Sequence, residues 1–454
     1  MMKKIISCLQ SFYMGIWYPV LVVGLVLIGH TMGREVLFCI LMLLSMTLGC
    51  WICDDLRFAV SPFLFTVFFV TVEHSPNVPN YSRYYLEPKV LIPLAIAFVL
   101  AVGSLICFAI RNRAKARRPS KTSMLWSLIV FCVGLLANGL FSANYKISNA
   151  VFAFAFVLTL VALYYLFSSY VRFDGKTVDY FLFCFLLAGI LITLQLLIAY
   201  GTNVRFDENS NPIKETVMIG WGVWTSIGGM LSFLMPVCFY FASKHQRGWI
   251  GFLIAFMEMF AILLSQSRGA LLVGAGIFVL CLIAVCFVGE YKRRNRIFAL
   301  STLLVGAVGV LVLSGRLISL LQNFIDYGFG DNGRFDMWRV GIQRFLGDPV
   351  FGSGFYDSYY DQGWYKAIFP YLYHNTLIQM LGGAGIVGFL AYAYHRFCTV
   401  RLVVKRPNPC KLFLGLGILG LFTFCLIDVL FFHVYPSIFY ALMLVAMDAS
   451  DEIA

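Results

Sequence analysis

Residues 89–110 read KVLIPLAIAFVLAVGSLICFAI, and this stretch decides the fold class. It has the length of the roughly 20 apolar residues that cross about 30 Å of hydrocarbon as a helix. Its apolar residues are continuous, whereas the strands of an outer-membrane barrel alternate apolar with polar residues. In lipid every backbone amide must bond within its own segment, so the stretch predicts a transmembrane helix.

Similar runs recur along all 454 residues, which are 61% hydrophobic and 12% charged, with a mean hydropathy of +0.84. We therefore expect an all-α integral membrane protein with about 12–14 transmembrane helices, forming a single polytopic membrane domain over residues 1–454. The candidate spans lie at about 12–30, 35–53, 59–72, 89–110, 123–141, 147–170, 178–200, 217–242, 249–265, 270–289, 297–313, 374–395, 411–427 and 430–447.

The basic residues predict the orientation of these spans. Lys3 and Lys4 precede the first apolar run, which lacks a small-residue cleavage site, so we expect a retained span and no cleaved signal peptide. With a cytoplasmic N-terminus, the inside segments carry 22 of the 34 Lys and Arg residues and the outside segments carry 12. The positive-inside rule then places both termini in the cytoplasm. The net charge of +12 is accordingly a topology signal, and we expect no nucleic-acid partner.

The cysteines and carboxylates give no sign of a metal site. The thirteen cysteines are scattered, and the one CxxC pair, Cys50 and Cys53, has no second pair with which to complete a zinc site. We expect neither a metal nor a cofactor. Glu258 lies inside a span, where it is either a functional acid or a neutral or paired structural carboxyl.

Residues 314–373 interrupt the apolar pattern and predict an extracytoplasmic cap. The segment carries five Lys or Arg, six Asp and many aromatic residues. After the helix-capping turn of Asp331, Asn332 and Gly333, apolar residues recur at spacings of three and four and predict a short amphipathic helix lying in the membrane interface. These residues are Phe335, Trp338, Ile342 and Phe345. The Tyr and Trp residues that follow, between 356 and 365, fit either an interfacial aromatic belt or a sugar-stacking surface.

Three residues at predicted helix starts on the outer face can carry chemistry. Arg268 and Arg334 each stand where free backbone amides and the positive end of a helix dipole favour an anion, so two arginines suit a diphosphate. His374 begins the span after the cap, and a neutral imidazole, which titrates near 6.5 when unperturbed, can act as a base. The alternatives are an arginine that reaches lipid headgroups, a solvated surface arginine, and a histidine bonded to backbone.

The motifs that contain these residues resemble the O-antigen ligase/O-antigen polymerase superfamily. They fall within residues 265–390 and comprise Ser265-Gln-Ser-Arg268-Gly-Ala270, Gly333-Arg334 with Trp338 one turn later, Gly352-Ser-Gly354, and His374-Asn375 with Leu377, Gly382, Gly385 and Gly388. The resemblance implies that Arg268 and Arg334 bind the diphosphate of a lipid carrier and that His374 activates the acceptor hydroxyl. Ser267, Trp338 and Asn375 are expected to support them.

The resemblance also implies a function. We expect a metal-independent glycosyltransferase in the cytoplasmic membrane, with its active site facing outward and an undecaprenyl-diphosphate-linked oligosaccharide as donor. We favour polymerisation of repeat units into O-antigen or capsule, because the chain has many spans and a fairly short cap. The alternatives are an O-antigen ligase that transfers finished polymer to a lipid A-core or other acceptor, and a transporter or flippase without chemistry. Membrane lipid and other polysaccharide-assembly proteins are the further expected partners.

Overall fold

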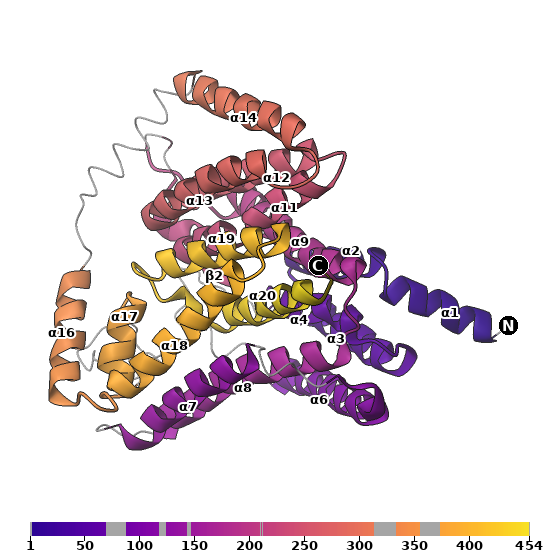
Figure 1. The fold of residues 1–454 in the computed structure, drawn as a ribbon, viewed down its shortest axis with the longest axis horizontal. Helices are drawn as coiled ribbons and strands as arrows, with labels where there is room; N and C mark the ends of the chain where they lie inside the picture. Colours follow the sequence, from indigo (N-terminus) through magenta and orange to yellow (C-terminus); the bar gives the residue numbers. More distant parts are fainter. Residues whose placement is uncertain are drawn as a thin grey trace. The chain divides into compact units, whose positions relative to one another are not determined.

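The computed structural model describes residues 2–69, 88–117, 124–142, 147–208, 210, 212–312, 333–354 and 373–453 (Figure 1). These residues are almost entirely helical, and the named strands among them form one two-stranded hairpin. The all-α prediction is therefore confirmed. The chain forms two compact units, Met1–Arg118 with Leu166–Asn295 and Ala449–Ala454, and Pro119–Tyr165 with Arg296–Asp448.

The first unit contains the N-terminal helices and the helices before the cap. Its elements are α1 (Met2–Tyr13), α2 (Trp17–Met32), α3 (Glu35–Ile52), η1 (Leu56–Ala59), α4 (Val60–Thr66), α6 (Pro88–Arg111), η2 (Arg113–Lys115), α9 (Gly175–Thr202), η3 (Lys214–Thr216), β1 (Met218–Ile219), β2 (Gly222–Val223), α10 (Trp224–Leu234), α11 (Pro236–Lys244), α12 (Trp249–Leu264) and α13 (Arg268–Phe287).

The second unit contains α7, most of α8, and the helices that follow α13. Its elements are α7 (Leu125–Phe141), α8 (Ile147–Tyr170), α14 (Lys292–Val312), α16 (Arg334–Gly347), α17 (Thr376–Ile378), the π-helix η4 (Gln379–Gly383), α18 (Ala384–Val404), α19 (Pro409–Phe424), η5 (Leu430–Phe432) and α20 (Val434–Ile453). The last turn of α8, the first turn of α14 and the last turn of α20 belong to the first unit.

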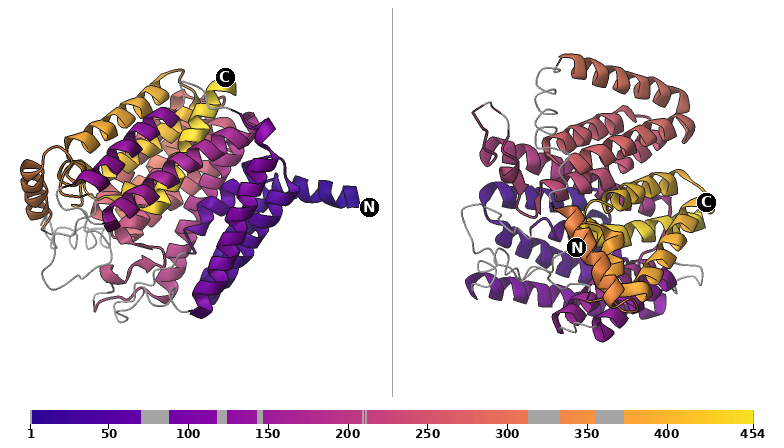
Figure 2. Two further views of the ribbon diagram at one scale, coloured as in Figure 1. Left: turned by 90° about the horizontal axis from the view of Figure 1, so that it is seen from below. Right: turned by 90° about the vertical axis from the view of Figure 1, so that its left-hand side faces the viewer.

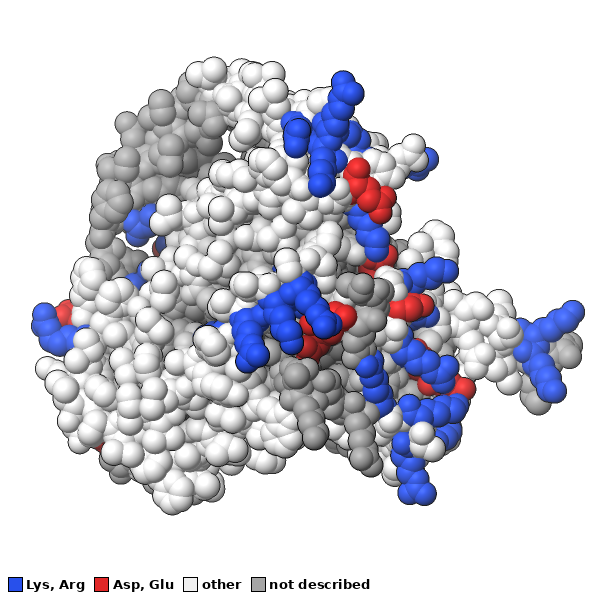
Figure 3. Space-filling model, in the orientation of Figure 1, with Lys and Arg blue, Asp and Glu red and all other residues white. Residues whose placement is uncertain are grey.

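The described helices have the length and composition of membrane spans. Seven helices among the described residues are long enough and apolar enough to cross a membrane. The count is eight if the bent pair α1 and α2 forms one span. Four shorter apolar helices accompany them within the described residues. Much of the surface visible in Figure 3 carries neither Lys, Arg, Asp nor Glu, as expected of a surface that faces lipid. The protein is thus a multi-pass membrane protein.

The first apolar run is not one straight helix, although the sequence predicts a span at 12–30. Helix α1 ends at Tyr13 and α2 begins at Trp17, with a bend of 68° between them (Figure 2). Pro19 lies in the first turn of α2, where its ring would clash with the carbonyl of Gly15 in a continuous helix. The break therefore follows from the position of the proline.

The helix in the region of the predicted span at 217–242 begins later than the sequence predicts. Residues 218–223 form the hairpin of β1 and β2, with Ile219 paired to Gly222 across a two-residue turn. Two-residue turns that contain glycine are typical of such hairpins. The helix starts only at Trp224, and Pro236, which lacks a backbone N–H, separates α10 from α11.

Candidate functional site

His374 lies immediately before α17 in a strained backbone conformation. Its φ angle is 49°, in the left-handed region that costs a residue with a side chain of order 1–3 kcal/mol. The neighbouring residues hold it there: the Tyr373 amide donates to Oε1 of Gln379 at 3.0 Å, and the Thr376 amide donates to the Cys425 carbonyl at 2.8 Å. The direction of the His374 side chain is therefore set by the backbone on both sides of it.

Asp428 faces the imidazole of His374. Oδ1 of Asp428 lies 3.4 Å from Nδ1 of His374 and also accepts a hydrogen bond from the Val429 amide at 2.7 Å. The side chain of Asp428 is 12% exposed, whereas that of His374 is 38% exposed. Burial raises the pKa of the Asp428 carboxyl, but the hydrogen bond and charge of His374 outweigh it, and the net pKa is lowered. The carboxylate is thus ionised and directed at one ring nitrogen of His374.

Asp428 was not among the residues expected from the sequence. It stands between the predicted spans at 411–427 and 430–447, in a segment expected on the same face as His374. An acidic residue in so short a connection between two spans is the signal that could have identified it.

Asn375 connects His374 to the loop that carries Asp428. Its side-chain oxygen caps α17 by accepting from the amides of Leu377 and Ile378, at 2.9 and 3.1 Å. Its Nδ2 donates to the Leu426 carbonyl at 2.9 Å. Asn375 therefore bonds both the start of α17 and the loop that precedes Asp428.

Arg334 is the first residue of α16, as the sequence predicts. Gly333 precedes it with a φ of 76°, which glycine adopts without strain, and the helix ends at Gly347 before Asp348 and Pro349. The half-buried side chain of Arg334 thus stands at the positive end of the helix dipole. No Arg334–His374 contact is described, so their shared role remains a prediction.

The buried face of α16 differs from the predicted apolar face. Met337 and Gly341 are buried, whereas Phe335 and Ile342 are 62% and 46% exposed. The reason is close packing: a Cβ at Gly341 would lie 2.4 Å from Cγ2 of Ile378. Hydrophobic spacing alone does not reveal a face that uses a glycine for contact. The exposed Phe335 and Ile342 remain available for the predicted position in the membrane interface.

Trp338 joins α16 to the segment before His374. Its Nε1 donates to the Tyr373 carbonyl at 3.0 Å. This bond spans 35 residues of sequence and lies one residue from His374. Trp338 therefore bonds α16 to the segment before His374, and α16 and α17 lie side by side in Figure 1.

The remaining glycines of the motif form a seam between α16, the loop after it and η4. A Cβ at Gly382 would lie 2.6 Å from the carbonyl oxygen of Gly341. The Ser353 amide donates to the Gly382 carbonyl at 3.0 Å, and the Gly354 amide donates to the Gly383 carbonyl at 3.1 Å. The turn at 352–354, which the sequence suggests is flexible, is thus bonded to the π-helix.

The Ser265–Ala270 turn belongs to the first unit. Ser267 is the N-cap of α13, and its hydroxyl accepts from the Ala270 amide at 3.3 Å. Ser265 and Ala270 pack against Gly228 of α10, where an added Cβ would lie 2.8 Å and 2.5 Å from them. Arg268 follows as the first residue of α13 and is half-buried. The structure confirms the predicted helix start and leaves the predicted meeting of Arg268 with the other two residues untested.

The other chemical candidates lie elsewhere or outside the described residues. Among the residues that the structure describes, no group of three His, Cys, Asp or Glu could hold a metal ion. Glu258 is buried in the first unit against Gly189 of α9 and beside Cys238 of α11. Of the predicted cap at 314–373, only 333–354 and residue 373 are described, so Asp331, Asn332 and the aromatic cluster at 356–365 fall outside.

Comparison with known families agrees with the motifs. Residues 250–393 match the family model described as O-antigen ligase, and this range includes Arg268, Arg334 and His374 but not Asp428. A search of curated proteins found no match. The match confirms, over residues 250–393, the resemblance of the chain to the O-antigen ligase/O-antigen polymerase superfamily.

Proposed function

We propose that the protein is a membrane glycosyltransferase that polymerises lipid-linked oligosaccharide repeat units into a surface polysaccharide. The donor is an undecaprenyl-diphosphate-linked glycan, and the acceptor is a hydroxyl of a new repeat unit. The observation that carries the proposal is the His374–Asp428 pair, in which an ionised carboxylate lies 3.4 Å from one nitrogen of a half-exposed histidine. The match to the O-antigen ligase family supports it.

In this mechanism His374 is the general base. Asp428 accepts the Nδ1–H of the imidazole and so fixes the tautomer in which Nε2 carries the lone pair. Nε2 takes the proton of the acceptor hydroxyl as its oxygen attacks the anomeric carbon of the donor. The bond between that carbon and the diphosphate breaks, and its electron pair leaves with the diphosphate. Removal of such a base typically costs about 10²–10⁴ in rate.

The two arginines stabilise the departing diphosphate. Arg334 at the start of α16 and Arg268 at the start of α13 each combine a guanidinium with the free amides of a helix N-terminus. Each charge-assisted contact is worth about 1.5–3 kcal/mol, so the loss of one arginine is expected to slow the reaction at least roughly tenfold. Because the two guanidinium groups neutralise the negative charge of the diphosphate, the transfer proceeds without a metal ion.

A ligase reaction is the second candidate, because the matching family is described as O-antigen ligase. The same base and arginines would serve it, since only the acceptor differs: a lipid A-core sugar in place of a new repeat unit. We favour polymerisation on the many spans of the chain and its fairly short cap. In either case we place the protein in the cytoplasmic membrane with both termini inside and His374 on the outer face.

An assay with purified protein and a defined undecaprenyl-diphosphate oligosaccharide tests the proposal. We expect lipid-linked products longer by whole repeat units, formed without added metal and abolished in His374→Ala. Transfer of the glycan to a lipid A-core acceptor, with no elongation, would establish the ligase instead. Transport between leaflets with no new glycosidic bond would establish the flippase, and a fully active His374→Ala variant would exclude the mechanism.

A further inference from the structure

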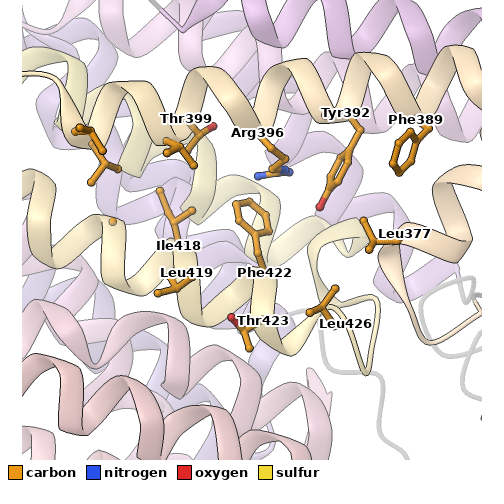
Figure 4. Close-up of a pocket in the computed structure, with 15 residues that line it drawn as sticks. Leu377, Phe389, Tyr392, Arg396, Thr399, Ile418, Leu419, Phe422, Thr423 and Leu426 are labelled. Atoms are coloured by element: carbon orange, nitrogen blue, oxygen red, sulfur yellow. The ribbon is translucent and has the colours of Figure 1, made fainter.

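Arg396 is a charged side chain within a candidate membrane span. It belongs to α18 and lines a groove of about 540 Å³ between α18 and α19, whose other lining residues are uncharged. Figure 4 shows its guanidinium over the ring of Phe422. A cation inside a span is costly and is usually held by partner groups, so the surroundings of Arg396 indicate its role.

Four aromatic rings surround this guanidinium, and we call them the aromatic cage. They belong to Phe422, Phe431, Tyr392 and Tyr440, whose ring centroids lie 3.4, 4.4, 4.6 and 5.1 Å from Cζ. Nη1 of Arg396 also donates to the Tyr440 hydroxyl at 3.0 Å. The faces of aromatic rings attract a cation, most strongly where water is excluded, so the arginine and the four rings hold one another in place.

The cage is anchored to α7 by hydrogen bonds. The Tyr440 hydroxyl lies 2.8 Å from Nε2 of His395, and Nδ1 of His395 lies 2.9 Å from the Ser127 hydroxyl. The imidazole of His395 also stacks on Phe131 of α7, with ring centroids 5.7 Å apart. Helices α7 and α20 therefore hold Arg396 in place independently of the loop that carries Asp428.

The cage joins the two segments that carry the His374–Asp428 pair. Arg396 and Tyr392 lie on α18, in the span that begins just after His374. Phe431 lies in the loop between α19 and α20, three residues after Asp428. Because Phe431 is fully buried, its contacts in the cage determine where this part of the loop can lie.

The loop is anchored on both sides of Asp428. Before it, the Cys425 carbonyl accepts from the Thr376 amide at 2.8 Å. After it, Phe431 sits in the cage, and its amide donates to Sγ of Cys425 at 3.3 Å. The carboxylate lies on the short stretch between these anchors, so loss of the second anchor would leave that stretch held at one end only.

We propose that Arg396 is a positioning residue of the transfer reaction. By holding Phe431 in the cage, it fixes the loop on the far side of Asp428 and keeps the carboxylate at Nδ1 of His374. This role rests on the proposed function, in which His374 is the base. It requires no ligand in the groove.

Steady-state elongation by the purified full-length protein tests this role. Arg396→Met keeps an unbranched side chain and removes the charge and the hydrogen bond to Tyr440. We expect kcat to fall about tenfold or more and the donor KM to stay nearly unchanged, because a displaced catalytic group slows the chemical step. Arg401→Gln is the matched control and should behave as wild type, since Arg401 is exposed on the same helix and does not line the groove.

A double-mutant cycle separates positioning from a general structural role. Adding Arg396→Met to Asp428→Asn should cost little further activity, because the arginine then has no carboxylate to position. Phe431→Leu leaves the arginine intact and should resemble Arg396→Met. Losses that multiply in the double variant would overturn the proposal, as would a wild-type kcat in both Arg396→Met and Phe431→Leu.

Hydrogen exchange of the backbone amides provides a readout that needs no turnover. In Arg396→Met we expect a peptide covering residues 428–433 to exchange about tenfold faster than in wild type, and a peptide from α16 to exchange at an unchanged rate. Unchanged exchange at 428–433, in a protein whose wild type elongates glycan, would refute the role of Arg396 alone. No elongation by wild type, with faster exchange in the variant, would refute the proposed reaction while supporting the hold of Arg396 on the loop.

Discussion

His374 and Asp428 are 54 residues apart in sequence and 3.4 Å apart in the structure. In the proposed mechanism the carboxylate orients the imidazole, which makes Asp428 a positioning residue. We expect Asp428→Asn to lower kcat about tenfold or more and to leave the KM for the donor nearly unchanged. Asp428→Glu should retain more activity than Asp428→Asn. Steady-state kinetics on the purified variants checks this, and equal loss in kcat and donor binding would point to a merely structural role.

The lowered pKa of Asp428 also predicts a pH dependence of stability. A carboxyl whose folded pKa is lowered stabilises the fold above its unfolded pKa of about 4, and this stabilisation is lost as pH falls through the folded pKa. The stabilisation of wild type relative to Asp428→Asn should therefore diminish as the solution is acidified below about pH 4. A difference in thermal midpoint that grows on acidification would contradict the assignment.

At the residue scale, the sequence predicted where the motif residues lie on the helices and gave no indication of Asp428. His374 and Arg334 were expected at helix starts, and the structure places them there. The left-handed backbone of His374 and its pairing with Asp428 could not be predicted, because both depend on how the loop after α19 returns to the start of α17.

At the scale of elements, the glycine seam holds α16 against η4. A methyl group at Gly382 would meet the carbonyl oxygen of Gly341 at 2.6 Å, and a backbone atom cannot move aside cheaply. We expect Gly382→Ala to destabilise the protein by roughly 1–3 kcal/mol and to lower activity, because α16 shifts relative to His374. Thermal unfolding and turnover of the purified variant measure both effects.

Gly347→Ala is the control for this prediction. Gly347 ends the same helix, and a Cβ there meets no atom within 4 Å. This variant should keep wild-type activity and stability, within about 1 kcal/mol, since alanine is the better helix former. If Gly382→Ala behaves like Gly347→Ala, the seam does not position α16.

The ends of α16 were predictable and its packing was not. Gly333 and the Gly347-Asp348-Pro349 sequence mark its start and end, as they would in any helix. The predicted span at 217–242 failed in its first turns because the hairpin at 218–223 consists of residues that are as apolar as those of a helix. Short apolar runs do not distinguish a strand from a helix.

For the molecule as a whole, the distribution of Lys and Arg predicts the orientation. We expect an impermeant maleimide to label Gly347→Cys in intact cells and to label Lys405→Cys only after permeabilisation, each in a background without the native cysteines. Both positions are exposed in the structure. The reverse pattern of labelling would place His374 on the cytoplasmic face and contradict the proposed use of an outward-facing donor.

Composition was sufficient to predict a helical multi-pass membrane protein, because lipid leaves few other options for an apolar backbone. It was less informative about the breaks within spans. The bend between α1 and α2 and the division of α10 from α11 arise at single prolines, which a hydropathy average over a whole span does not resolve.

The seam between α16 and η4 has an evolutionary consequence. Its contacts are made by glycines and main-chain carbonyls, so they do not depend on which side chains the outward face of α16 carries. Phe335 and Ile342 on that face can therefore be substituted without changing the contacts that hold α16 against η4. Sequence drift at these exposed positions then leaves the packing of the helix intact.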